Sequence, residues 1–112
     1  MTLTLALSYG GRQEILDAIL KIVSQVQENK ISASDITEKL VSNSLYTSGM
    51  PDPDLLIRTS GEYRISNFLL WQISYSEIYI TQTMWPDFGE NEYKKALRDY
   101  QMRDRRFGGR DR

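Results

Sequence analysis

The chain has 112 residues, with 14 Lys and Arg against 15 Asp and Glu, and it contains neither cysteine nor histidine. This length suits one domain or part of one, and the balanced charge argues against a chain-wide surface for nucleic acid. Disulfides, thiolate metal sites and histidine acid–base catalysis are excluded, so any chemistry must use carboxylates, guanidiniums and hydroxyls. Residues 1–7 lack the basic start of a signal peptide, and no apolar run approaches the roughly 20 residues of a membrane span.

The first part of the chain predicts a strand followed by a helix. Residues 2–7 alternate Thr and Ala with Leu, which is the period-two pattern of a strand, and Gly10 and Gly11 then allow a tight turn. From Gln13 to Val26 the apolar residues recur with helical spacing and form a broad apolar stripe.

The middle of the chain predicts a second helix and a buried strand. Ser32–Asp35 resembles a capping box, which indicates a helix that continues to about Ser42. Residues 47–54 contain two prolines and form a connector. Leu55–Ile57 is a short apolar run typical of a buried parallel strand, and Arg58 stands at its carboxyl end.

The remaining elements complete an alternating pattern. We expect a helix over residues 68–73 capped by Ser66, a strand over residues 78–81, a turn at residues 85–89 and a final helix from Asn91 to about Arg106. This order predicts an α/β fold with a mostly parallel sheet flanked by helices. Such sheets bind ligands beyond the carboxyl ends of their strands.

Charged and hydroxyl side chains are concentrated on the loop after the predicted strand that ends at Arg58. Arg64 and Ser66 follow on the same loop, so two guanidiniums, a hydroxyl and a helix start would converge on one spot. Proteins hold phosphate and diphosphate groups in this way. The alternative is that the arginines form salt bridges with Glu62 or Asp54 and that Ser66 only caps the helix.

Other features carry weaker signals. Glu77, at the end of the predicted helix and start of the next strand, suits a Mg²⁺ site beside a bound diphosphate, although a carboxylate that points into water is the simpler interpretation. The arginines between Arg98 and Arg112 are consistent with a solvated helix face. The aromatic residues fit core and turn packing, so no nucleic-acid partner is predicted.

Four stretches together resemble the cis-prenyltransferases of the undecaprenyl diphosphate synthase type. The longest is the run from Asp54 to Gln72, which is similar to the C-terminal signature of that family. Three others agree with the family in order and spacing: Ser8–Arg12, Glu77 with Trp85–Phe88, and Arg103–Gly109.

The resemblance implies an activity and a site. Members of the family condense isopentenyl diphosphate with an allylic diphosphate and make cis-polyprenyl diphosphates, which serve as lipid carriers for cell-wall glycans. By this resemblance Arg58, Arg64, Ile65 and Ser66 bind isopentenyl diphosphate, and Glu77 binds Mg²⁺.

The resemblance also implies further roles and a setting. Glu62 would be an auxiliary acidic residue of the catalytic site, and Arg106 and Gly108 would reach into the active site of the partner subunit in a homodimer. The enzyme would be cytoplasmic, with a peripheral membrane contact for product release.

The sequence departs from the family at several points. The N-terminal segment His-x-x-Met-Asp-Gly-Asn-x-Arg-Trp, which carries the main catalytic aspartate and the loop for the allylic diphosphate, has no counterpart here. Tyr63 stands where some members have histidine, and Ser8 where others have asparagine. Residues 1–112 are therefore expected to be the C-terminal portion of a single cis-prenyltransferase domain and to be inactive alone. A non-catalytic partner subunit and a simple anion-binding module remain as alternatives.

Overall fold

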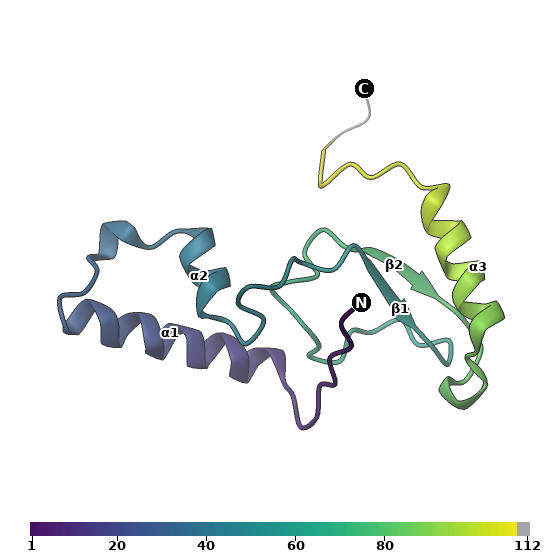
Figure 1. Cartoon of the computed structure of the whole chain (residues 1–112), viewed down its shortest axis with the longest axis horizontal. Helices are drawn as coiled ribbons and strands as arrows, with labels where there is room; N and C mark the ends of the chain where they lie inside the picture. Colours follow the sequence, from purple (N-terminus) through teal and green to yellow (C-terminus); the bar gives the residue numbers. More distant parts are fainter. Residues whose placement is uncertain (110–112) are drawn as a thin grey trace. The chain divides into compact units, whose positions relative to one another are not determined.

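The computed structural model describes residues 1–109 and divides into two units (Figure 1). Unit 1 contains Met1–Pro51 and Asn67–Trp71, and unit 2 contains Asp52–Ser66 and the described residues from Gln72 onward. Helices and one parallel strand pair make up these units, so the predicted α/β class is confirmed.

Helix α1, Gly11–Gln27, is the main element of unit 1 and confirms the helix predicted from the apolar spacing. Its N-cap residue is Gly10, which has no side chain to bind the free N–H groups of the first turn. Asn67 takes over that role, since its carbonyl accepts the Gly11 N–H at 2.6 Å and its Oδ1 accepts the Arg12 N–H at 2.9 Å. A Cβ on Gly11 would lie 2.8 Å from Leu70 Cγ, so glycine is needed for this approach.

A buried carboxylate joins three segments of unit 1. The Glu14 side chain is 1% exposed, and it accepts hydrogen bonds from the Tyr46 N–H, at 2.9 Å, and from the Tyr9 hydroxyl. Burial, with the hydrogen bond to Glu14 second, raises the pKa of Tyr9 well above its usual value. The Tyr46 hydroxyl donates to Asp17, and this hydrogen bond lowers the pKa of Asp17. The polar groups of this cluster therefore bind one another.

Two predictions for unit 1 need correction. Residues 2–7 form no strand and are exposed, because the only ladder in residues 1–109 joins two other segments and leaves this alternating stretch without a hydrogen-bonding neighbour. The capping box does form, with Ser32 N–H donating to Asp35 at 2.8 Å, but it closes only a 3₁₀ turn. Helix α2, Glu38–Ser44, begins later, after Thr37 accepts the Leu40 N–H at 3.1 Å.

Unit 2 is built around strands β1, Leu55–Arg58, and β2, Glu77–Ile80, which pair in parallel as the sequence predicted. In their register Leu55 faces Glu77 and Arg58 faces Ile80. After β2 come a 3₁₀ turn at Trp85–Asp87 and helix α3, Glu90–Gln101, whose Ala96 is fully buried. The strand pair thus has Arg58 at its carboxyl end and Glu77 at its amino end.

Two predicted helical segments differ in the structure. Residues 68–73 form turns instead of a helix, and Ser66, Asn67 and Leu69 have φ values of 50°, 64° and 45°. A right-handed helix cannot start from such left-handed residues, so the predicted helix capped by Ser66 is wrong. Helix α3 ends at Gln101 and not near Arg106, so Arg103, Arg105 and Arg106 belong to an irregular tail, while Arg110 and Arg112 lie outside the described residues.

Candidate functional site

Arg58 ends β1 at the carboxyl end of the strand pair, where the sequence placed it. Its side chain is half-buried, and its Nε is buried without a hydrogen-bond partner in the part of the chain that the structure describes. Among the described residues Arg58 has no ion pair, since Asp54 binds Arg105 at 2.7 Å and Glu62 binds Arg64 at 3.0 Å. A cation in this position without a counter-charge is unfavourable, so the guanidinium is available to an anionic ligand.

The backbone after β1 turns sharply and is fixed to the segment after β2. The N–H groups of Ser60 and Gly61 donate to the carbonyls of Thr83 and Thr81, at 2.9 and 2.8 Å. Ser60 and Gly61 both have φ of 65°, which places two consecutive residues in the left-handed region. These bonds hold the start of the polar loop firmly beside the strand ends.

The second arginine of the loop is held much less firmly. Arg64 forms the predicted salt bridge with Glu62, at 3.0 Å, but the two side chains are 74% and 40% exposed. Exposed ion pairs contribute about 0–1 kcal/mol, so an anionic ligand can replace Glu62 as the partner of Arg64. Ile65 and Ser66 are also exposed. Because no helix starts at Ser66, the loop offers guanidiniums and a hydroxyl to an anion, without a helix dipole.

Glu77 is not brought together with this loop. It lies at the amino end of the strand pair, three residues from the end that carries Arg58, a separation of roughly 10 Å at about 3.3 Å per residue. Its carboxylate is 3.6 Å from Arg103 Nη1. Glu77 instead lines a hollow of about 450 Å³ together with Asp104, Arg106 and Gly108. The site residues predicted from the sequence therefore fall into two groups. The loop group is Arg58, Glu62, Arg64, Ile65 and Ser66, and the tail group is Glu77, Arg106 and Gly108.

The tail group contains a defined turn. Gly109 N–H donates to the Arg106 carbonyl at 2.8 Å, and Phe107 and Gly108 have φ of 49° and 80°. Positive φ at both central residues is typical of a type I′ turn. A Cβ on Gly108 would lie 3.3 Å from Tyr75 Cε1, so both the backbone and the contact favour glycine.

The carboxylates fit a magnesium ion only together with other ligands. Residues 1–109 hold no group of three or more Asp and Glu that could bind a metal, and the tail hollow offers two carboxylates, Glu77 and Asp104. Mg²⁺ usually binds one or two carboxylates and takes its remaining ligands from phosphate oxygens and water. The donor set therefore suits a metal that arrives with a diphosphate.

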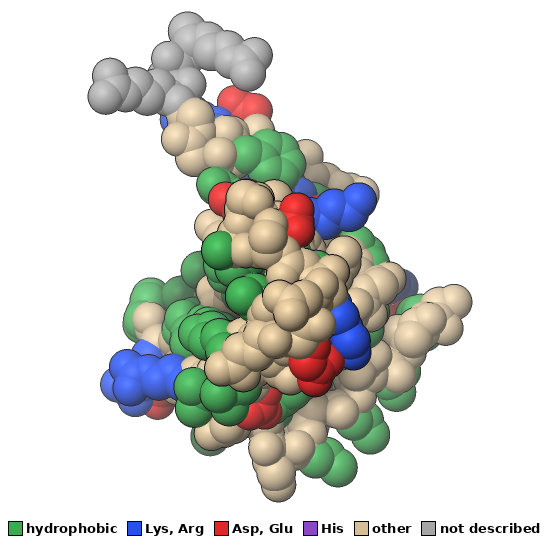
Figure 2. Space-filling model, turned by 90° about the vertical axis from the view of Figure 1, so that its left-hand side faces the viewer, with side chains coloured by type: hydrophobic (Ala, Val, Ile, Leu, Met, Phe, Trp, Pro, Cys, Tyr) green, Lys and Arg blue, Asp and Glu red, His purple; other side chains and the backbone are tan. Residues whose placement is uncertain are grey.

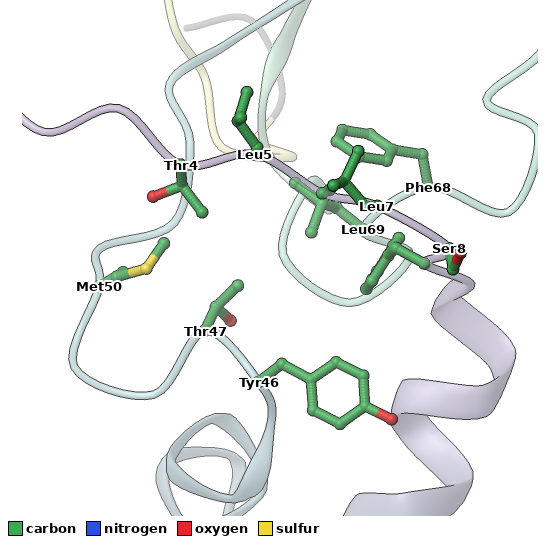
Figure 3. A pocket seen from close by; sticks show the side chains of 11 residues that line it. Thr4, Leu5, Leu7, Ser8, Tyr46, Thr47, Met50, Phe68 and Leu69 are labelled. Carbon is green, nitrogen blue, oxygen red and sulfur yellow. The ribbon is translucent and has the colours of Figure 1, made fainter.

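Unit 1 contains an apolar cavity that the sequence did not predict. Its volume is about 370 Å³, and in Figure 3 Leu5, Leu7, Met50 and Phe68 surround the open space. The full lining is Thr4, Leu5, Ala6, Leu7, Ser8, Tyr9, Tyr46, Thr47, Met50, Phe68 and Leu69. It could be recognised only after folding, because the lining comes from segments more than 60 residues apart along the chain.

Hydrophobic side chains also lie open on the surface, among charged ones (Figure 2). On α1 they are Leu16, Ile19, Leu20 and Val23. No helix in residues 1–109 is both long enough and apolar enough to cross a bilayer. An exposed apolar stripe on an amphipathic helix is typical of a surface that packs against another segment or chain.

A parallel strand pair thus ends at Arg58, which has no ion pair among residues 1–109, and a basic turn containing glycine lies in the tail. Guanidiniums beyond the carboxyl ends of parallel strands can bind anions. Residues 1–108 match the family model described as "Putative undecaprenyl diphosphate synthase". The chain therefore belongs to this family of prenyltransferases, and the resemblance found in the sequence is confirmed.

Curated relatives and a solved structure agree with this assignment. Isoprenyl transferases of Prochlorococcus marinus and Clostridium perfringens are 58% and 56% identical over 96% and 97% of the chain. The chain spans only 40% and 43% of those relatives' lengths. The crystal structure of lavandulyl diphosphate synthase from Lavandula x intermedia, in complex with dimethylallyl diphosphate, superposes with a TM-score of 0.89 at 44% identity, over 93% of this chain and 45% of that one.

Proposed function

We propose that residues 1–112 are the C-terminal portion of a single cis-prenyltransferase domain and supply its isopentenyl diphosphate site. The reaction is the condensation of isopentenyl diphosphate with an allylic diphosphate to give a cis-polyprenyl diphosphate. The observation that supports this most directly is the half-buried guanidinium of Arg58, which has no ion pair within the described part of the chain. The related lavandulyl diphosphate synthase was solved with dimethylallyl diphosphate, which supports a prenyl diphosphate as the ligand of this fold.

In this proposal the loop group binds the diphosphate of isopentenyl diphosphate. Arg58 supplies a fixed cation, because the backbone on either side of it is hydrogen-bonded to β2 and the segment after it. Arg64 leaves Glu62 and closes on the same diphosphate, with Ile65 and the Ser66 hydroxyl beside it. Glu62, once released, is the auxiliary acidic residue of the site. Planar guanidiniums bind phosphate oxygens in pairs, which orients the substrate as well as binding it.

The tail group has the other roles. Glu77 is proposed as a ligand of Mg²⁺, which when bound would neutralise diphosphate charge and stabilise the departing diphosphate of the allylic substrate. Arg106 and Gly108 are proposed to act in the active site of the partner subunit of a homodimer. The enzyme would be cytoplasmic, with a peripheral contact at the membrane where the product is released.

The loop group favours a catalytic chain over a helper subunit. A partner subunit that only completed another chain's site would need the tail but not an unpaired Arg58 or a loosely held Arg64. A simple anion-binding module would need the arginines but not the fitted turn at Gly108. Both groups are present in this chain, as a prenyltransferase requires.

Isothermal titration of the 112-residue chain with isopentenyl diphosphate and Mg²⁺ tests the assignment. Loss of a charge-assisted hydrogen bond costs about 1.5–3 kcal/mol, so Arg58→Ala should weaken binding roughly tenfold to a hundredfold. Arg98→Ala, which removes an exposed arginine of α3, is the matched control and should leave affinity unchanged. Equal loss in both variants would contradict the proposal. Equal affinity for inorganic diphosphate would favour the anion-binding module.

A further inference from the structure

The Arg105 side chain binds three separate segments of unit 2. It is 18% exposed, and its Nη1 donates to Asp54 Oδ1 at 2.7 Å and to the Tyr100 hydroxyl at 3.3 Å. Its Nη2 donates to the Tyr75 carbonyl at 2.9 Å. One guanidinium therefore ties the tail to the residue before β1, to α3 and to the segment before β2, all within unit 2.

The same guanidinium holds the turn that follows. Its central carbon lies 4.3 Å from the centroid of the Phe107 ring, and that ring lies 6.5 Å from the ring of Tyr75. Arg106 thus stands between two residues that are fixed to the body of unit 2. Its own side chain is 50% exposed, with a long 3.7 Å ion pair to Asp104.

The backbone of the turn is strained in a way that requires such support. Phe107 has φ of 49°, and a non-glycine residue in the left-handed region persists only where its surroundings over-determine it. The contacts of the Phe107 ring with the Arg105 guanidinium and with the tilted Tyr75 ring supply that constraint. Strain of this kind is found mostly at functional sites, where it presets the direction of a side chain.

We infer that Arg105 is a positioning residue. By binding Asp54 and stacking on Phe107, it sets the Arg106–Gly109 turn and thereby the direction in which Arg106 is presented. This inference rests on the proposed function, in which Arg106 and Gly108 serve the diphosphate site of the partner subunit. Lysine cannot replace Arg105, because it has neither the planar fork that reaches Asp54 and Tyr75 together nor the flat face that stacks on Phe107.

Two measurements on the whole 112-residue chain test the inference. The first is the rate of trypsin cleavage after Arg106, read by mass spectrometry, which reports whether the tail is docked. The second is the affinity for isopentenyl diphosphate with Mg²⁺, read by isothermal titration. The variants are Arg105→Lys, which keeps the charge and a trypsin site, Asp54→Asn, Arg106→Ala and the double variant Arg105→Lys with Arg106→Ala. Arg98→Lys, the same change on an exposed arginine, is the matched control.

We expect Arg105→Lys and Asp54→Asn each to accelerate cleavage several-fold and to weaken affinity about three- to tenfold, while Arg98→Lys changes neither. Because Arg105 acts through Arg106, the double variant should bind no more weakly than Arg106→Ala alone. Faster cleavage with unchanged affinity, or additive losses in the double variant, would show a purely structural role and overturn the inference. If Arg106→Ala leaves affinity unchanged in a chain that is dimeric by analytical ultracentrifugation, the proposed role of the tail is wrong. Unchanged cleavage in Arg105→Lys would overturn the inference while leaving that role in place.

Discussion

The Glu14 cluster of unit 1 and the loop after β1 in unit 2 differ in how their polar groups are satisfied. In unit 1 the buried Glu14 carboxylate is matched by Tyr9 and Tyr46, and Asn67 binds the free N–H groups of α1. In unit 2 the half-buried Arg58 has no counter-charge among the described residues, and the partner of Arg64 is an exposed carboxylate. Groups that bind one another stabilise a fold, whereas groups left without a partner are available to a ligand.

The largest expected effect concerns catalysis itself. It would show that the proposed diphosphate-binding residues of unit 2 are not sufficient for prenyl transfer. The 112-residue chain alone should transfer no prenyl groups, because it contains no match to the segment whose aspartate and loop activate the allylic substrate. The measurement is incorporation of radiolabelled isopentenyl diphosphate into polyprenyl product by the pure chain. Product formed without contaminating host synthase would contradict the prediction.

Substitutions of Glu14 in unit 1 and Arg58 in unit 2 should have different effects on the free energy of unfolding. Glu14→Ala leaves the Tyr46 N–H and the Tyr9 hydroxyl without their acceptor, and each loss costs about 1–3 kcal/mol of unfolding free energy. Urea unfolding should therefore show a loss of about 2–6 kcal/mol in unfolding free energy. Arg58→Ala should leave stability unchanged or raise it slightly, since it removes a half-buried cation whose Nε has no hydrogen-bond partner among residues 1–109. Equal destabilisation by both substitutions would contradict the claim that Glu14 stabilises the fold and Arg58 does not.

A substitution in the loop should raise the KM for isopentenyl diphosphate and have much less effect on the KM for the allylic diphosphate. In an enzyme made by joining residues 1–112 to the N-terminal part of the Clostridium perfringens relative, Arg64→Lys should raise the KM for isopentenyl diphosphate about tenfold, because lysine keeps the charge but lacks the fork. The KM for the allylic diphosphate should change much less. If both constants rise equally, or only the allylic one rises, the loop does not serve isopentenyl diphosphate. If neither constant changes and only thermal stability falls, Arg64 serves the salt bridge with Glu62 and does not bind substrate.

The smallest effect concerns the pH dependence of unit 1. The hydrogen bond from Tyr46 lowers the pKa of Asp17 in the folded chain, so this carboxylate stabilises the fold above its unfolded pKa, about 3.9. That contribution should be lost as the pH falls below this value and through the lower folded pKa. Tyr46→Phe should make thermal stability less dependent on pH in this acid range while leaving isopentenyl diphosphate binding at neutral pH unchanged. An identical acid profile for both chains would contradict the assignment.

Local patterns determined much of this protein. The 3.6-residue spacing of apolar residues in α1 and the apolar run that ends at Arg58 depend on chemistry within a few turns of chain, and both elements form as predicted. The motifs that carry the family resemblance are likewise contiguous, so family membership and the candidate residues could be recognised without a structure.

Contacts between distant residues decided the rest. Residues 2–7 have a strand pattern but no neighbour to pair with in the described chain, and the left-handed residues at 66, 67 and 69 replace a helix that local propensity favoured. The register of the parallel pair, which sets Glu77 opposite Leu55 and Arg58 opposite Ile80, is likewise decided by contacts between distant residues. Arg105 looks like one arginine among several until folding brings Asp54, 51 residues away, against it. Burial and the choice of partner are properties of the folded chain, and they distinguish a structural arginine from one available to a ligand.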